Sequence, residues 1–147
     1  ATKQLVQACE KFQGQITSGA NSIAQRAAIV ALTGNLDASK KMTKAFHERR
    51  DFIIDALSKM PGVKVSNPQG AFYAFPNISS FFGKSDGTTV INNDEDLSMY
   101  LLHTGHITTV CGSAFGNDNC IRISFATSMD NLKKAMELMC DALKRLK

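Results

Sequence analysis

The sequence has no stretch of apolar residues long enough to cross a membrane, which excludes a transmembrane helix. It has no Cys-x-x-Cys pair, and its three histidines do not complete the spacing of a metal site. It also lacks internal repeats and low-complexity segments, which excludes repeat proteins and disordered tracts. These absences predict a globular protein with neither a membrane span nor a bound metal.

Positive charge is not concentrated enough to indicate a nucleic-acid partner. The chain has 17 Lys and Arg against 13 Asp and Glu, a net charge of +4. Basic residues are spread along the chain except between Lys40 and Arg50, where they share one expected helix with Glu48 and Asp51. No interleaving of aromatic and basic residues and no nucleic-acid-binding motif accompanies them. We therefore expect a solvated helix face there and no nucleic-acid partner.

The four cysteines indicate a reducing compartment. The four cysteines have no paired spacing, and reduced thiols of a cytoplasmic protein account for them most simply: they are Cys9, Cys111, Cys120 and Cys140.

At 147 residues, the chain suffices for one domain or slightly more. It opens without Met and enters a helical pattern at once, with Leu5, Ala8 and Phe12 on one face. We expect it to be a piece of something longer.

Apolar residues recur with a helical period in five segments. In the longest, 38–60, the 3.6-residue period continues for about six turns, with Asp37 as the expected cap and Pro61 as the stop. A helix of this length in so small a chain is expected to connect two bodies. The other expected helices are 3–13, one capped by Asn21 or Ser22 that ends near Leu32, one capped by Asn93 that ends at Gly105, and one capped by Ser128 or Asp130 near the C-terminus.

Four short segments have the composition of strands: 63–65, 71–75, 107–110 and 120–126. The polar segment 79–92 is expected to be a mobile loop. The order of elements predicts an α/β fold in which N-terminal helices and a long connecting helix precede a two-layer α+β domain with a small sheet of about four strands. We expect 1–37 to be a helical piece of another domain and 38–147 to be this small domain.

Arg122 is the strongest candidate for a binding residue. It lies in a strictly alternating segment in which Ile121, Ile123 and Phe125 point one way, and Arg122 and Ser124 the other. A guanidinium held by a rigid strand can grip a planar carboxylate through two parallel hydrogen bonds. An edge-strand Arg paired with a surface carboxylate would have the same pattern, so the strand alone leaves both interpretations open.

Three stretches together carry a resemblance to a known family. They are QGQITS at 13–18 with SIAQ at 22–25, GAFYAF at 70–75, and GSAFG at 112–116 followed by IRISFA at 121–126. In these stretches the chain resembles the C-terminal part of a fold-type I, class I and II pyridoxal-phosphate aminotransferase of the aspartate aminotransferase family. The match covers nearly the whole chain, and the last stretch is the most specific.

The resemblance implies roles for particular residues. Arg122 is at the position where the family binds the α-carboxylate of the amino acid, and Phe72 is on the strand that lines the active-site cleft. Phe115 is in the loop beside it. Ser18 is in a loop that approaches the neighbouring subunit's site in the dimeric family. Core packing is the alternative interpretation for Phe72 and Phe115.

The resemblance also implies a function for the longer protein. Such an enzyme transfers an amino group between an amino acid, here aspartate or a similar one, and a 2-oxo acid, and it acts as a homodimer. Its cofactor, pyridoxal 5′-phosphate, forms a Schiff base with a lysine that lies before the point where this chain starts. The resemblance therefore implies no catalytic residue in this chain, no cofactor-binding residue beyond the contact of Ser18, and no activity for the chain alone.

A second function class fits the same residues. A free-standing small α/β regulatory or ligand-binding domain could use Arg122 to hold an acidic metabolite without chemistry. The sequence just upstream would discriminate between the two. A Lys followed by a phosphate-binding turn favours the enzyme, and its absence favours the binding domain.

Overall fold

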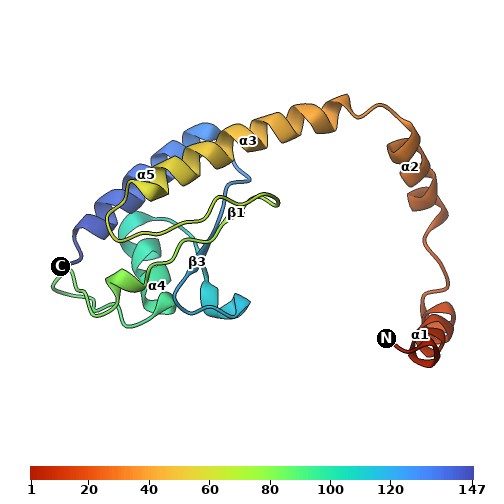
Figure 1. Ribbon diagram of the computed structural model, residues 1–147, viewed down its shortest axis with the longest axis horizontal. Helices are drawn as coiled ribbons and strands as arrows, with labels where there is room; N and C mark the ends of the chain where they lie inside the picture. The colour runs from red at the N-terminus through yellow and green to blue at the C-terminus, as the bar shows by residue number, and fades with distance from the viewer. The chain divides into compact units, whose positions relative to one another are not determined.

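The computed structural model describes all 147 residues, which divide into two compact units, Ala1–Lys40 and Lys41–Lys147. Five α-helices and one sheet of three antiparallel strands confirm the α/β class (Figure 1). The expected domain boundary is after residue 37, and the division between the units lies within the first turns of the helix that begins there. None of the helices is long and apolar enough to cross a membrane.

The first unit consists of two capped helices, α1 (Lys3–Ile16) and α2 (Ser22–Thr33), and the start of a third. The Thr2 side chain accepts a hydrogen bond from the backbone N–H of Leu5 at the start of α1. At the start of α2, Asn21 Oδ1 accepts from Ile23 N at 2.8 Å, so Asn21 is the cap expected from the sequence. Local backbone chemistry therefore accounts for where both helices begin.

No residue of α1 or α2 is buried. Apolar side chains of the unit remain more than half exposed: Leu5, Val6, Phe12, Ile16, Ile23, Ile29, Val30, Leu32 and Leu36. Burial of apolar surface is the main source of folding free energy. The unit therefore gains almost none of that free energy from its own contacts.

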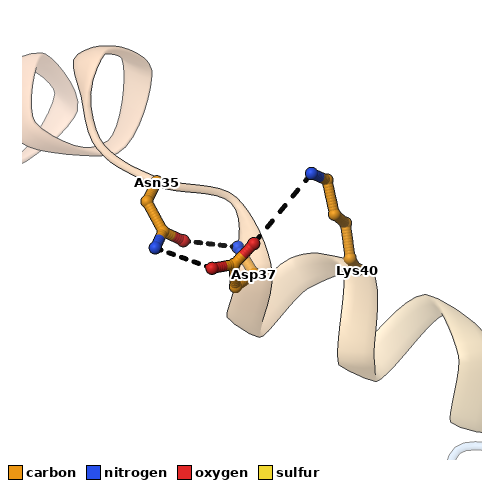
Figure 2. Close-up of polar contacts among 3 residues, drawn as sticks. All are labelled: Asn35, Asp37 and Lys40. Atoms are coloured by element: carbon orange, nitrogen blue, oxygen red, sulfur yellow. Dashed lines mark hydrogen bonds and ion pairs between the residues drawn. The ribbon is translucent and has the colours of Figure 1, made fainter.

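Helix α3 (Asp37–Ser58) begins differently from the expectation. Figure 2 shows that the Asn35 side chain accepts a hydrogen bond from Asp37 N at 2.6 Å and donates one to the Asp37 carboxylate at 2.8 Å. Asn35 therefore fills the role expected of Asp37, because an Asn side chain readily bonds to the backbone two residues ahead. Asp37 is instead in the first turn, 4.0 Å from Lys40, and both side chains are too exposed for this pair to stabilise much.

The second unit contains the sheet, whose strands are β1 (Tyr73–Ala74), β2 (Val110–Cys111) and β3 (Ile121–Ser124). Their order is β1-β3-β2, so the longest strand is central. Both neighbours pair antiparallel with β3. Each strand is shorter than the segment expected from the sequence.

The expectation of about four strands is wrong, because 63–65 forms no strand. Lys64 makes a single antiparallel bridge with Asn77. On one side of this bridge, the N–H of Val63 bonds to Met60 O in the turn that ends α3, and the chain enters a short 3-10 helix after Ile78. The ladder cannot extend in that direction, since both chains turn away from it.

The core of the second unit lies between one face of the sheet and three helices: α3, α4 (Asp94–Gly105) and α5 (Met129–Lys144). Figure 1 shows α3 and α5 side by side, and side chains of both line a groove between them. Asn93 and Ser128 cap α4 and α5 as expected. The sheet contributes Ile121 and Ile123, which are buried among helix residues, so the unit has two layers.

The segment 79–92, which the sequence suggests is a mobile loop, folds against this core. It contains the 3-10 helix η1 (Ser79–Phe81), and both Phe81 and Ile91 are buried. The Asp86 carboxylate accepts hydrogen bonds from the backbone N–H of Thr89 and from the backbone and side chain of Thr88. These bonds lower the pKa of Asp86 to about 2.

Candidate functional site

One face of the sheet is open, and the strand register decides which side chains lie on it. Arg122 and Ser124 share a face of β3, because successive strand residues point to opposite sides. Tyr73 pairs with Ser124, and Val110 pairs with Arg122, so these two lie on the same side. We call this set of four residues the open face. None of the four is buried.

The guanidinium of Arg122 lies against two aromatic rings. Its central carbon is 4.5 Å from the centroid of the Tyr73 ring and 4.3 Å from that of Phe115. At both distances the electron-rich ring face attracts a cation. Tyr73 is in β1, and Phe115 is in the 3-10 helix η2 (Gly112–Phe115) that follows β2. The two rings therefore come from elements on different sides of β3, and the Phe115 ring extends to Phe75, directly after β1, at 6.3 Å between ring centroids.

Arg122 has no carboxylate partner within the chain. The ion pairs of the molecule all lie elsewhere, on α3 and α5, and no acceptor receives a hydrogen bond from the Arg122 nitrogens. The edge-strand ion pair that the sequence left open is therefore not formed. A half-buried guanidinium with unused N–H donors can bind a carboxylate through two parallel hydrogen bonds.

The loop that carries Phe115 is fixed by a close backbone approach at Gly112. A Cβ atom at this position would lie 2.2 Å from Cys120 O and 2.3 Å from Asn117 O. Only glycine allows the chain to pass this close. The Gly112 carbonyl also accepts from Asn117 N at 3.1 Å, which closes the loop on itself.

A buried carboxylate ties this loop to α4. Asp94 Oδ2 accepts a hydrogen bond from the backbone N–H of Ser113 at 2.8 Å. Burial raises the pKa of Asp94, but the hydrogen bonds from Ser113 together with those from the backbone N–H groups of Asp94 and Glu95 outweigh burial, so the pKa lies below that of a free aspartate. The contact between Asp94 and Ser113 joins residues 19 positions apart, and no local pattern indicates such a contact.

Phe72 lies beside the open face rather than in the core. It is 41% exposed, stacks on Phe46 of α3 at 5.8 Å between ring centroids, and contacts the Tyr73 ring at 4.8 Å. Phe115 is 48% exposed and meets Phe75 edge-on at 6.3 Å. Phe72 also lines a cavity of about 300 Å³ with residues of α3 and of 68–71. Phe72 and Arg122 are thus brought together through Tyr73.

Ser18 belongs to the first unit. It lies in the connection between α1 and α2, is exposed, and has a left-handed backbone conformation with φ of 59°. This conformation is uncommon for a residue other than glycine. The chain bends at the next residue, Gly19.

The open face does not fit pyridoxal phosphate by itself. That cofactor needs a lysine amine for its attachment and a carboxylate for its ring nitrogen. The four residues of the open face and the Phe115 ring supply a guanidinium, two hydroxyl groups, two aromatic rings and an apolar side chain, but neither an amine nor a carboxylate. No three His, Cys, Asp or Glu side chains gather where they could hold a metal ion. The arrangement suits anion binding rather than bond-making chemistry.

The family model described as "Aminotransferase class I and II" matches residues 1–139. Among curated proteins, the bifunctional aspartate aminotransferase and glutamate/aspartate-prephenate aminotransferase of Petunia hybrida is 46% identical over 99% of this chain and 31% of its own length. The aspartate aminotransferase of Pinus pinaster is 46% identical over 91% of this chain and 28% of its own. The chain spans about a third of the length of these relatives.

Solved structures show the same fold. The aspartate aminotransferase of Rhizobium meliloti superposes with a TM-score of 0.90 at 39% identity, over 98% of this chain and 36% of that one. The alanine aminotransferase of Pyrococcus furiosus gives a TM-score of 0.82 at 33% identity, over 97% of this chain and 35% of that one. Both helical and sheet portions are therefore matched almost end to end.

Proposed function

The chain belongs to the class I and II aminotransferase family, and on that premise we propose that it is the substrate-carboxylate-binding part of a longer aminotransferase. The longer enzyme transfers an amino group between aspartate, or a similar amino acid, and a 2-oxo acid. The names of the Petunia hybrida and Pinus pinaster relatives support this substrate class.

The observation that carries the proposal is Arg122 on the open face, with two aromatic rings against its guanidinium and no carboxylate partner in the chain. Amino-acid and 2-oxo-acid substrates share one feature, a carboxylate beside the reacting carbon. Two parallel hydrogen bonds from one guanidinium fix the direction of that carboxylate. The bond to be broken at the adjacent carbon is then oriented before the reaction, which lowers the entropic part of the barrier.

The cofactor of the longer protein is proposed to be pyridoxal 5′-phosphate, which the family implies and which supplies the electron sink for the reaction. The open face offers no amine and the chain spans about a third of its relatives' length, so we propose that the groups that hold the cofactor lie outside this chain and that the chain alone is inactive. Incubation of the 147-residue chain with the cofactor and borohydride, followed by mass spectrometry, tests this. We expect no stoichiometric adduct, and an adduct on one specific lysine would contradict the proposal.

The remaining assignments follow from the same premise. Residues 1–37 are proposed to be part of the large cofactor-binding domain, and 38–147 the small domain with its connecting helix α3. The exposed apolar side chains of α1 and α2 support a larger domain around them. The longer protein is also proposed to be a homodimer in which Ser18 approaches the partner's site. Its proposed location is the cytoplasm, which is consistent with four unpaired cysteines.

Substitution of Arg122 by Lys in the longer protein tests the proposed function. Lys presents a point charge and cannot reproduce the two-pronged contact. We expect kcat/KM for amino-acid and 2-oxo-acid substrates to fall alike, by about 2–4 kcal/mol in transition-state free energy. Arg145→Lys, at the exposed end of α5, is the matched control and should leave kcat/KM for both kinds of substrate unchanged. A loss of less than about threefold for Arg122→Lys would remove it from the site.

The alternative is that the chain is a free-standing binding domain. The separate core of the second unit favours this alternative. The sequence upstream of the chain decides between the two. A lysine followed by a phosphate-binding turn supports the enzyme. A short upstream sequence without such a lysine supports the binding domain.

A further inference from the structure

We propose that Tyr73 and Phe115 are positioning residues, which hold the Arg122 guanidinium in place while leaving its N–H donors free for the substrate carboxylate. The inference rests on the proposed function of Arg122 and deepens it. It explains how an arginine side chain, with several rotatable bonds, keeps one orientation without a carboxylate partner in the chain.

The two rings hold the guanidinium from different elements. Tyr73 belongs to β1 and Phe115 to η2 after β2, so the two rings are carried by elements on different sides of β3. The centroid distances of 4.5 and 4.3 Å are nearly equal. Movement of the guanidinium away from either ring would therefore lose one of these two attractive contacts.

Each ring is itself fixed by further contacts. Tyr73 is held by its pairing with β3 and by the Phe72 ring at 4.8 Å. Phe115 meets Phe75 edge-on at 6.3 Å, and its loop is tied to α4 through the bond between Ser113 N and Asp94 at 2.8 Å. The orientation of Arg122 is thus linked through both rings to the folded core.

Aromatic rings suit this task better than carboxylates would. A carboxylate partner would orient Arg122 equally well but would occupy the donors that the substrate needs. A ring attracts the cation through its face and accepts no conventional hydrogen bond from it. A chain that holds the guanidinium against two rings therefore keeps the binding group both oriented and unoccupied.

The test compares leucine substitutions, which remove the ring, with substitutions that keep it, in the longer protein. The variants are Tyr73→Leu and Phe115→Leu against Tyr73→Phe and Phe115→Tyr, with Phe82→Leu as a control elsewhere in the second unit. The readouts are KM and kcat for the amino-acid substrate and the Kd of succinate, a dicarboxylate with no amino group to transfer.

We expect each leucine variant to raise KM and the succinate Kd about threefold to tenfold with kcat changed less than about twofold, and the ring-keeping variants to recover most of the affinity. The control should bind succinate as the parent does. The positioning role is overturned if the leucine variants bind succinate unchanged, if kcat falls while KM does not, or if ring-keeping variants lose as much affinity as the leucine variants.

Arg122→Gln in the same assay separates this inference from the proposed function. If Arg122→Gln leaves succinate binding unchanged, the proposed function itself fails. If Arg122→Gln weakens binding at least about tenfold and the leucine variants do not, only the positioning role fails. The two changes are also coupled on our account, so Phe115→Leu should have no further effect on succinate binding in the Arg122→Gln background.

Discussion

The two units of the chain differ in where their apolar side chains lie. In Ala1–Lys40, helices α1 and α2 have no buried residue, and Leu32 is 86% exposed. In Lys41–Lys147, residues of three helices and the sheet form one buried cluster. Both units have well-capped helices, so local propensity does not distinguish them.

The difference shows what each unit needs in order to be stable. The second unit has its own buried core, and the open face is built on the sheet that packs against this core. The first unit has the helices but not the burial that makes helices persist, since most helical stability in proteins comes from tertiary packing. The candidate site is on the unit that has the buried core.

The largest expected effect is on the free energy of unfolding when a Phe is replaced by Ala in one unit or the other. Phe125→Ala removes a ring that is fully buried in the second unit and should lower the free energy of unfolding by about 3–5 kcal/mol. Phe12→Ala removes a largely exposed ring in α1 and should change it by less than about 0.5 kcal/mol. Urea denaturation of the 147-residue chain, followed by circular dichroism, measures both. Equal losses would mean that the units are not as different as described.

A smaller effect on the free energy of unfolding tests whether the loop with Phe115 is part of the folded second unit. Asp94→Ala leaves the Ser113 N–H without its acceptor and should lower the free energy of unfolding by about 1–3 kcal/mol at pH 7. Glu95→Ala, at the exposed neighbouring position, should cost less than about 0.5 kcal/mol.

The same contact gives a pH dependence with a definite sign. Because the pKa of Asp94 is lowered in the folded state, its contribution is fully present above the pKa of an unfolded aspartate, about 3.9. It is lost as the pH falls through the lower folded-state pKa. The stability difference between the parent chain and Asp94→Ala should therefore shrink below about pH 4. A difference that stays constant down to pH 2 would show that the charge is not involved.

Thiol reactivity compares the units through one side-chain type. Cys9 is exposed on α1, whereas Cys120 is buried in the second unit, and burial raises the pKa of its thiol. Alkylation of Cys120 should be at least about tenfold slower than that of Cys9, since it needs both opening of the fold and ionisation of the thiol. Mass spectrometry without reductant should also find all four thiols free. Equal rates, or an internal disulfide, would contradict this.

The smallest effect concerns the turn in 79–92. A carboxylate titration by NMR should give Asp86 a pKa of about 2, because its hydrogen bonds from Thr89 and Thr88 favour the charged form. Stability that depends on this group is present above the ordinary value of 3.8 and is lost between 3.8 and about 2. Thr88→Val removes one donor and should move the pKa part of the way back. A value near 3.8 in the parent chain would mean that the segment is mobile, as the sequence suggested.

The sequence predicts helices better than strands in this chain. Apolar periodicity and polar caps extend over many residues, and Asn21, Asn93 and Ser128 cap helices as expected. A strand of two to four residues carries little pattern, so 63–65 looked like a strand although it makes one bridge. Asn35 was missed as a cap because its bond to Asp37 depends on the backbone between them.

The site could be predicted only in part, because contacts between residues far apart in the sequence leave no local pattern. Alternation in the sequence placed the Arg122 side chain on the face opposite the neighbouring isoleucines, and the strand register agrees. The rings beside it come from residues 49 positions earlier and 7 positions earlier, Tyr73 and Phe115, and no periodic pattern connects those positions. The bond between Asp94 and the Ser113 backbone is also a product of tertiary structure.

The most direct test of the central claim is a crystal structure of the longer protein with succinate bound. Our account predicts that one carboxylate of succinate accepts two hydrogen bonds from the Arg122 guanidinium, at about 2.7–2.9 Å between nitrogen and oxygen. It also predicts that the rings of Tyr73 and Phe115 remain against the guanidinium. Succinate bound away from Arg122, or Arg122 paired with a carboxylate of the protein itself, would contradict the account.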